Sequence, residues 1–165
     1  MRVVGIDAST NMSGIAVMRD GVLEHYTLID LHKEKDAMKR IPMMMIKICE
    51  VLDKYNIDAI HMEKSILKSN TDTLQKLSNL AGAIMFYCAK NEIEFVNPFP
   101  SEWRKKIGIT QSSKVKREVL KQEAIYAVKM EYELDVNDDI AEAILLARSA
   151  FNLPKLNVSE DDLWL

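Results

Sequence analysis

The chain opens with three short apolar runs separated by turn residues, and this arrangement constrains the fold more than any other feature. The runs are Val3–Ile6, Gly14–Met18 and Val22–Leu28. Asp20 and Gly21 stand between the second and third runs, and an Asp-Gly pair between two apolar runs is a strong signal for a tight β-hairpin. The sequence therefore predicts three consecutive antiparallel strands at the start of the chain.

After these runs, helical patterns alternate with short strands. In chain order we expect a helix over 35–55, a strand over 57–62, a helix over 74–88, a strand over 94–96, and helices over 113–132 and 138–151. Parallel strands need a crossover between them, so the helices before the fourth and fifth strands predict parallel pairing there. The expected fold is α/β, with a five-stranded mixed sheet of three antiparallel and then parallel strands, flanked by helices.

The length of 165 residues, 48% of them hydrophobic, is sufficient for one well-buried core. We expect one domain over 1–151 and an acidic tail over 152–165 that is either disordered or docked through Trp164. The chain starts without a signal segment, and no apolar run approaches the roughly 20 residues that span a bilayer. A cytoplasmic protein with no membrane partner is therefore expected, with Cys49 and Cys88 as reduced thiols in the core.

The net charge of −3 argues mildly against nucleic-acid binding, but the charge is segregated along the chain. The segment 104–121 contains one acid, Glu118, and seven cations, which are Arg104, Lys105, Lys106, Lys114, Lys116, Arg117 and Lys121. This basic segment is either a solvated helix face or a surface for a phosphate backbone. Trp103, just before it, either stacks on a base or anchors a loop to the core.

Two carboxylates stand at the ends of predicted strands. Asp7 ends the first strand and Glu63 ends the fourth. If these two strands are adjacent and parallel, both side chains leave the sheet at the same end within a few ångströms. Like charges at close range raise each other's pKa, so this arrangement is costly without a cation.

Two more carboxylates, Asp139 and Glu142, lie three residues apart and share one face of the first turn of the last predicted helix. Hard oxygen ligands from several elements suit Mg²⁺, with Mn²⁺ as a substitute, and two such ions support hydrolysis of a phosphodiester. Each acid also has a simpler interpretation: Asp7 in a turn, Glu63 paired with Lys64, and the helix pair as N-terminal acids. Their joint placement favours a metal site.

Three segments resemble motifs of the RuvC family of Holliday junction resolvases, which belong to the ribonuclease H-like nucleases. Residues 5–14 are similar to the family's Gly-Ile-Asp-Pro-Gly motif and downstream glycine, residues 60–63 to its second motif, and residues 139–143 to the Asp-x-x-Asp-Ala of its last helix. Lys114 follows Gly108 at the separation of a family lysine near the scissile phosphate, and Arg104 or Lys105 matches a second basic residue after one deletion.

The resemblance covers about residues 1–151 and implies a ribonuclease H-like fold and a homodimeric endodeoxyribonuclease. Such an enzyme cleaves branched DNA such as four-way junctions by a two-metal mechanism. The resemblance makes Asp7, Glu63, Asp139 and Glu142 the catalytic metal ligands and adds Lys114 as a catalytic residue. The expected DNA-binding residues are Trp103, Arg104, Lys105, Lys106, Lys114, Lys116, Arg117 and Ile66.

Three positions depart from the family pattern. Ala8 replaces a proline, Glu142 replaces an aspartate, and Ile66 lies in the segment 64–67 where the family commonly offers an aromatic wedge. The last departure puts sequence-selective cleavage in doubt. The implied dimer is built largely on the second helix, whose apolar stripe agrees with it but is also explained by core packing.

Other functions fit parts of the pattern. Residues 5–14 also resemble the first phosphate loop of sugar kinases and actin-like ATPases, but these proteins bind ATP between two such domains. A DNA-structure-binding protein with weak or no catalysis is a second alternative. A nuclease that acts on other branched or hybrid nucleic acids is a third, since the metal site does not report which nucleic acid enters.

Overall fold

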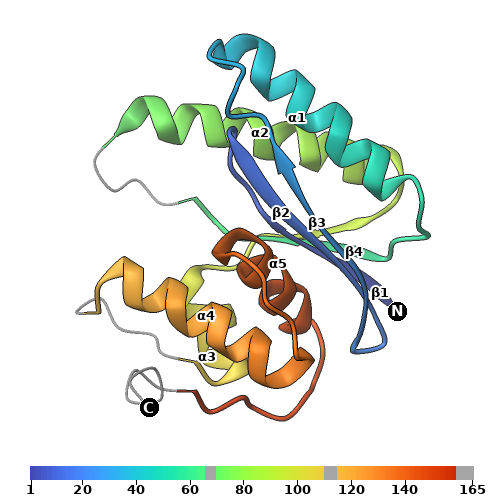
Figure 1. The fold of residues 1–165 in the computed structure, drawn as a ribbon. Coiled ribbons are helices and arrows are strands. Elements are labelled where there is room, and N and C mark those ends of the chain that lie inside the picture. Colours follow the sequence, from blue (N-terminus) through green and yellow to red (C-terminus); the bar gives the residue numbers. More distant parts are fainter. Residues whose placement is uncertain (66–69, 110–114, 159–165) are drawn as a thin grey trace.

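The structure is a computed structural model that describes residues 1–65, 70–109 and 115–158. Its elements are β1 (Arg2–Asp7), β2 (Met12–Arg19), β3 (Val22–Asp30), α1 (Ala37–Leu52), β4 (Ala59–Met62), α2 (Thr71–Lys90), β5 (Glu94–Val96), α3 (Pro100–Ile107), α4 (Arg117–Tyr132) and α5 (Asp138–Arg148) (Figure 1). None of the helices within the described ranges is long and apolar enough to cross a membrane.

The five strands form one mixed sheet in the order β3-β2-β1-β4-β5. The pairs β1–β2 and β2–β3 are antiparallel, whereas β1–β4 and β4–β5 are parallel. Asp20 and Gly21 both have positive φ, of 50° and 84°, as the tight hairpin turn between β2 and β3 requires. The predicted α/β architecture with its mixed sheet is confirmed.

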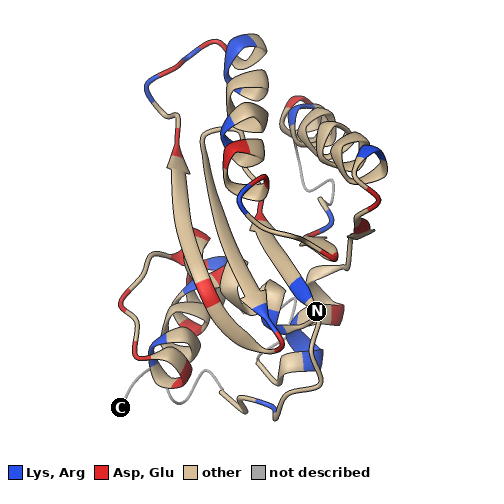
Figure 2. Cartoon of the chain, turned by 90° about the vertical axis from the view of Figure 1, so that its right-hand side faces the viewer, with Lys and Arg blue, Asp and Glu red and all other residues tan. Residues whose placement is uncertain are grey.

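The sheet lies between two layers of helices (Figure 1). One hydrophobic core joins α1 and α2 to one face of the sheet, and a second joins α3, α4 and α5 to the other face. Both signs of charge are spread over the helices, and the middles of the strands carry few charges (Figure 2). Cys88 is buried in the first core and Cys49 is half-buried, and both are free thiols.

Two glycines let α5 lie directly against the sheet. A Cβ atom at Gly5 would lie 2.0 Å from the carbonyl oxygen of Ala143, and one at Gly14 would lie 1.9 Å from the carbonyl oxygen of Asp139. Both distances are far below van der Waals contact, so any side chain at these positions would push α5 away. The close approach brings the first turn of α5 to the end of β1.

The helix α3 was not predicted, because its eight residues carry five polar or charged side chains and too short an apolar pattern. Local signals nevertheless define its ends. Pro100 occupies the first turn, the backbone N–H of Phe99 donates to Glu102 Oε2 at 2.8 Å, and Gly108 ends the helix with φ of 79°. The basic segment therefore begins on a helix.

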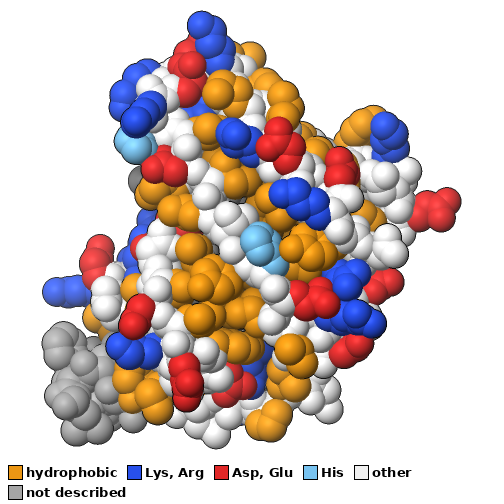
Figure 3. Space-filling model, turned by 45° about the vertical axis from the view of Figure 1, so that its right-hand side comes forward, with side chains coloured by type: hydrophobic (Ala, Val, Ile, Leu, Met, Phe, Trp, Pro, Cys, Tyr) orange, Lys and Arg blue, Asp and Glu red, His pale blue; other side chains and the backbone are white. Residues whose placement is uncertain are grey.

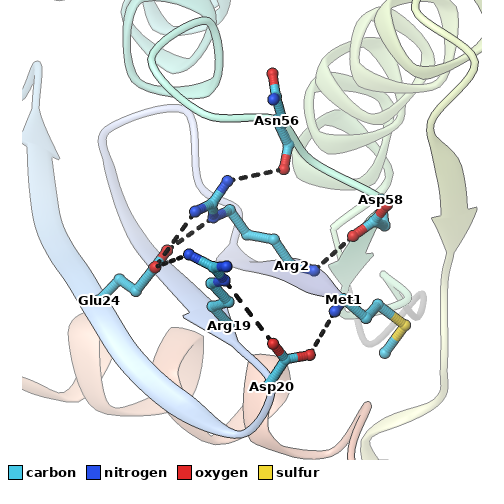
Figure 4. A network of polar contacts seen from close by, with 7 residues as sticks. All are labelled: Met1, Arg2, Arg19, Asp20, Glu24, Asn56 and Asp58. Carbon is cyan, nitrogen blue, oxygen red and sulfur yellow. Dashed lines mark hydrogen bonds and ion pairs between the residues drawn. The ribbon is translucent and has the colours of Figure 1, made fainter.

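A network of polar contacts joins the start of β1 to the β2–β3 hairpin and to β4 (Figure 4). The amino group of Met1 contacts Asp20, and Arg2 Nε donates to Glu24 Oε2 at 2.7 Å. The backbone N–H of Arg2 donates to Asp58 Oδ2 at 2.6 Å. These contacts fix the near ends of three strands, so the register at the far end of β1 is set as well.

Residues 152–158 continue along the second core after α5. The backbone N–H of Leu156 donates to the carbonyl of Ile107 at 2.8 Å, and Arg148 donates to the carbonyl of Pro154 at the same distance. Leu156 and Val158 pack against the second core. This part of the expected tail is docked, and Trp164 lies outside the described residues.

Candidate active site

Two of the four expected carboxyl groups meet where β1 and β4 end in parallel. Ile6 pairs with Met62, so Asp7 and Glu63, the next residues, leave the sheet side by side. Both line a cleft of about 380 Å³ whose other walls include the start of α2 and Arg117. The parallel pairing that the sequence predicted thus places these two acids together.

The helix α5 brings the other two carboxyl groups from its first turns. Asn137 caps this helix, because its side-chain oxygen accepts from the backbone N–H of Ile140 at 3.0 Å. Asp139 is hydrogen-bonded to Asp7, and Glu142, one turn further on, faces the same cluster. All four acids therefore meet over the ends of β1 and β4.

The adjacent acid Asp138 is held differently from Asp139. Its carboxylate forms an ion pair with Lys121 of α4. Asp138 still contributes repulsion to the cluster, because its charge helps to raise the pKa of Asp139 and of Asp7. The contacts favour Asp139 over Asp138 as the member that faces Asp7.

The pKa shifts show that the four acids do not tolerate full ionisation together. Burial, followed by repulsion from Glu142, Glu63 and Asp139, raises the pKa of Asp7 well above its usual range. Burial and then the charge of Glu63 raise the pKa of Glu142 to about 7, against the opposing effect of Arg104. At neutral pH this cluster must therefore hold protons or bind cations.

The donor set fits divalent metal ions, although its present arrangement is not that of a bound site. Carboxylate oxygens from a sheet and a helix are the hard ligands that Mg²⁺ and Mn²⁺ take, and a cation would relieve their repulsion. Among the residues that the structure describes, no three carboxyl, imidazole or thiol groups are already placed to hold one ion.

Trp103 and Arg104 lie in the interior instead of on the expected DNA-binding surface. Each is 2% exposed. Trp103 Nε1 donates to Glu63 Oε2 at 2.8 Å, and Arg104 Nη2 lies 2.8 Å from Glu123 Oε2. The structure does not support direct DNA contacts by these two residues, because their polar groups are turned inward to carboxylates.

Most of the other described cations of the basic segment lie on the surface. Lys105, Lys106, Lys116 and Arg117 are exposed, and Arg117 lines the carboxylate cleft. Lys121 is half-buried and is paired with Asp138, as described above. The predicted positions Lys114 and Ile66 lie outside the described residues.

Sequence reasoning missed Glu123, whose side chain is 1% exposed and pairs with Arg104. It lies on the helix α4 among charged residues, and a single sequence has no signal that distinguishes a buried glutamate from a solvated one. Arg104 also lies 3.6 Å, through Nη1, from Glu142 Oε1. The buried pair therefore adjoins the carboxylate cluster.

A second and larger hollow lies away from the carboxylates. It runs along the start of β3 and is lined by residues 21–26 together with Tyr132 and Leu134. Hydrophobic side chains gather on this face of the molecule (Figure 3). With Glu24 as the one acid among its described lining residues, and that acid bonded to Arg2, this hollow offers no comparable chemistry.

Solved structures with the same fold include junction resolvases. T. thermophilus RuvC in complex with a Holliday junction substrate superposes with a TM-score of 0.72 at 17% identity, over 90% of this chain and 91% of that one. The fowlpox virus resolvase in complex with substrate Holliday junction DNA gives a TM-score of 0.60 at 14% identity, over 91% and 96%. These matches show the ribonuclease H-like fold.

Sequence comparison gives the family. A crossover junction endodeoxyribonuclease RuvC of Bifidobacterium longum is 26% identical over 152 residues, which cover 87% of this chain and 77% of the relative. A RuvC of Bdellovibrio bacteriovorus is 25% identical over 158 residues, covering 93% and 92%. The family model described as crossover junction endodeoxyribonuclease RuvC matches residues 3–146. This chain therefore belongs to the RuvC family.

Proposed function

We propose that this protein cleaves four-way DNA junctions with two Mg²⁺ ions held by Asp7, Glu63, Asp139 and Glu142. Members of its family are metal-dependent junction endonucleases. The observation that carries the proposal is the convergence of four acidic side chains, whose burial and mutual repulsion raise the pKa values of Asp7 and Glu142. Such a cluster is stabilised by cations, and Mn²⁺ has the same preference for oxygen ligands.

The bound ions would supply an activated water and stabilise the leaving oxygen of the phosphodiester. Asp7 is repelled by each of the other three acids, so it would be the residue best suited to hold both ions. Glu63 and the α5 acids approach it from two sides, which keeps the ligand set on rigid elements. The cleft beside Asp7 and Glu63 is also lined by Thr73 and Leu74 near the start of α2, and we place the nucleic-acid strand along it.

Exposed cations on α3 and α4, of which Arg117 lines this cleft, suit the phosphate backbone. Lys105 and Lys106 on α3 and Lys116 and Arg117 at the start of α4 provide four accessible positive charges. We assign Lys114 to the scissile phosphate and Ile66 to a contact beside the branch point, both on the family resemblance. Backbone contacts of this kind make affinity fall steeply with salt.

A second copy of the chain is the proposed occupant of the outer face of α1 and α2. Five large hydrophobic side chains are exposed there, at Met38, Met43, Ile46, Met85 and Phe86. Of these, Ile46 lines an apolar hollow of about 610 Å³, which Ala83 of α2 also lines. Exposed apolar patches of this kind mark interaction sites, and a junction with two symmetric strands requires two active sites.

The apolar stripe of α2 does not itself form this surface. Its residues Leu80, Ile84 and Cys88 are buried in the first core. Met85, which belongs to the same predicted stripe, is exposed, and so is Phe86 beside it. The proposed dimer therefore uses only the exposed part of the stripe that the sequence pattern suggested, together with Phe86.

The decisive experiment is the substitution Asp7→Asn, because an amide of the same shape cannot supply the negative charge that holds the ions. Nicking of a labelled four-way junction in Mg²⁺ should be abolished, whereas junction binding in a gel shift should stay near or above the wild-type level. Asp58→Asn is the matched control, since Asp58 lies at the opposite end of the sheet and bonds the backbone of Arg2. A folded Asp7→Asn protein that still nicks at a substantial fraction of the normal rate would contradict the two-metal mechanism.

A substrate panel tests the choice of nucleic acid. Four-way junction, fork, duplex and RNA–DNA hybrid, each labelled, are incubated with the protein in Mg²⁺ and separately in Mn²⁺. We expect the junction to be cleaved fastest in both metals. Faster cleavage of the fork or the hybrid would make that nucleic acid, and not the junction, the preferred substrate. Binding of the junction without cleavage in either metal would favour a protein that binds DNA structures without cutting them.

A further inference from the structure

The contact between Trp103 and Glu63 gives α3 a part in the metal site. Trp103 is buried, and its indole N–H points at Glu63 Oε2 at 2.8 Å. A carboxylate has two oxygens and about four acceptor positions, so one bond from the indole to Oε2 does not use them all. The indole thus restricts the rotation of Glu63 without occupying all of its acceptor positions.

A neutral hydrogen-bond donor such as the Trp103 indole is better suited to hold a metal-binding carboxylate than a cationic side chain is. An indole N–H is neutral, so it orients a carboxylate without repelling a divalent ion that binds the same group. Arg104, by contrast, keeps its Nη1 atom 3.6 Å from Glu142 Oε1, a longer and less directed approach. Of these two neighbours on α3, Trp103 is therefore the one suited to remain in place when metal binds.

The helix that carries Trp103 is itself fixed. Arg104 Nη2 lies 2.8 Å from Glu123 Oε2 and donates to the carbonyl of Leu120 at 3.1 Å, which ties α3 to α4. The Arg104 guanidinium lies 5.2 Å from the centre of the Trp103 ring. At the end of α3, the carbonyl of Ile107 accepts from the docked segment 152–158.

We propose that Trp103 is a positioning residue that orients Glu63 toward the metal ions, and that the buried Arg104–Glu123 pair fixes the helix from which it does so. The inference rests on the metal site proposed above. Hydrogen bonds to the outer side of metal ligands typically change metal affinity or activity by about 10- to 100-fold when they are lost. Trp103→Phe keeps an aromatic ring and removes the N–H, so it isolates this bond.

The first test measures Mn²⁺ binding by the electron paramagnetic resonance signal of free Mn²⁺. Both proteins carry Trp164→Phe, a matched loss of an indole, and one of them also carries Trp103→Phe. The dissociation constant should rise about 10-fold or more in the Trp103→Phe protein. Nicking at saturating Mn²⁺ should recover to within a few-fold, so the loss is in the metal requirement and not in kcat. Dissociation constants within twofold of each other would overturn the inference.

The second test needs no change at Trp103, so it also decides the case in which Trp103→Phe does not fold. In ¹⁵N-labelled Trp164→Phe protein, the indole N–H resonance comes from Trp103 alone. Titration with Mg²⁺ should shift it, and Glu63→Gln should abolish the shift while the indole keeps an acceptor. A resonance that Mg²⁺ does not move, in protein that binds Mg²⁺, overturns the role of Trp103. A protein that binds neither Mn²⁺ nor Mg²⁺ overturns the proposed metal site itself.

Discussion

The metal-free protein should lose stability as the pH rises from 5 to 8, and Glu142 should account for much of that loss. Its pKa is raised from 4.5 to about 7, chiefly by burial and then by Glu63. A folded-state pKa above the unfolded value means that the folded protein holds the extra proton. The stabilisation is therefore complete below about pH 4.5 and is lost as the pH rises through about 7.

The magnitude follows from the same shift. The Glu142 side chain is 21% exposed, so solvent screens it little. With 1.36 kcal/mol for each pH unit, the change from 4.5 to about 7 corresponds to about 3 kcal/mol of unfolding free energy. For a domain of this size, 1 kcal/mol shifts Tm by about 2–4 °C, so the expected fall in Tm is roughly 10 °C.

The assay is thermal unfolding by circular dichroism in chelator at pH 5, 6, 7 and 8. Glu142→Gln removes the titrating group and one source of repulsion on Asp7, so its Tm should depend much less on pH. Glu118→Gln, at an exposed position of α4, is the matched control and should follow the wild type. Saturating Mg²⁺ should restore the wild-type Tm most strongly at pH 8, where ions do not compete with protons. Parallel curves for wild type and Glu142→Gln would refute the reasoning.

Three further predictions use other parts of the structure. Arg104→Met should destabilise the protein by about 3–5 kcal/mol because it leaves Glu123 buried without its cation, and the double variant with Glu123→Met should recover most of that loss in chemical denaturation. Gly14→Ala should abolish nicking and lower Tm, since the added Cβ would overlap the carbonyl of Asp139. Gly82→Ala on α2, where a Cβ meets no atom within 4 Å, is the control and should do neither. Unchanged activity of the Gly14→Ala protein would contradict the close packing of α5 on the sheet. Lys114→Ala should reduce the nicking rate more than junction affinity, and equal losses of both would make Lys114 an ordinary phosphate contact.

Local signals predicted the hairpin and the parallel direction of the later strands, and from these the meeting of Asp7 and Glu63 followed if β1 and β4 were neighbours, as they are. The hairpin depends on Asp20 and Gly21, and the parallel pairing of β1 and β4 depends on the helix between them. Once those two features are known, Asp7 and Glu63 must leave the sheet at the same end. The positions of these residues are consequences of short-range chemistry, which a single sequence contains.

The surroundings of the acids could not be predicted in this way. Arg104 and Lys105 are adjacent cations in one run, yet Arg104 is buried and Lys105 is exposed. What separates them is the side of α3 on which each lies and the presence of Glu123, which is 19 residues away from Arg104. Burial of an ion pair depends on how two helices pack, and charge patterns along the chain do not report it.

The same packing explains why the acids cannot relieve their repulsion by moving apart. Asp7 is fixed by the register of β1 with its neighbours, and Asp139 is carried by a helix whose backbone lies against Gly14. Glu63 is bonded to Trp103. Because the backbone holds the carboxylates together, relief has to come from protons or from bound cations. The buried cation nearest to them, Arg104, is engaged by Glu123, and its effect leaves the pKa of Glu142 raised to about 7. The fold therefore leaves negative charge at the cleft that the nearby buried arginine does not neutralise. Divalent metal ions suit this site because they bind carboxylate oxygens strongly at neutral pH.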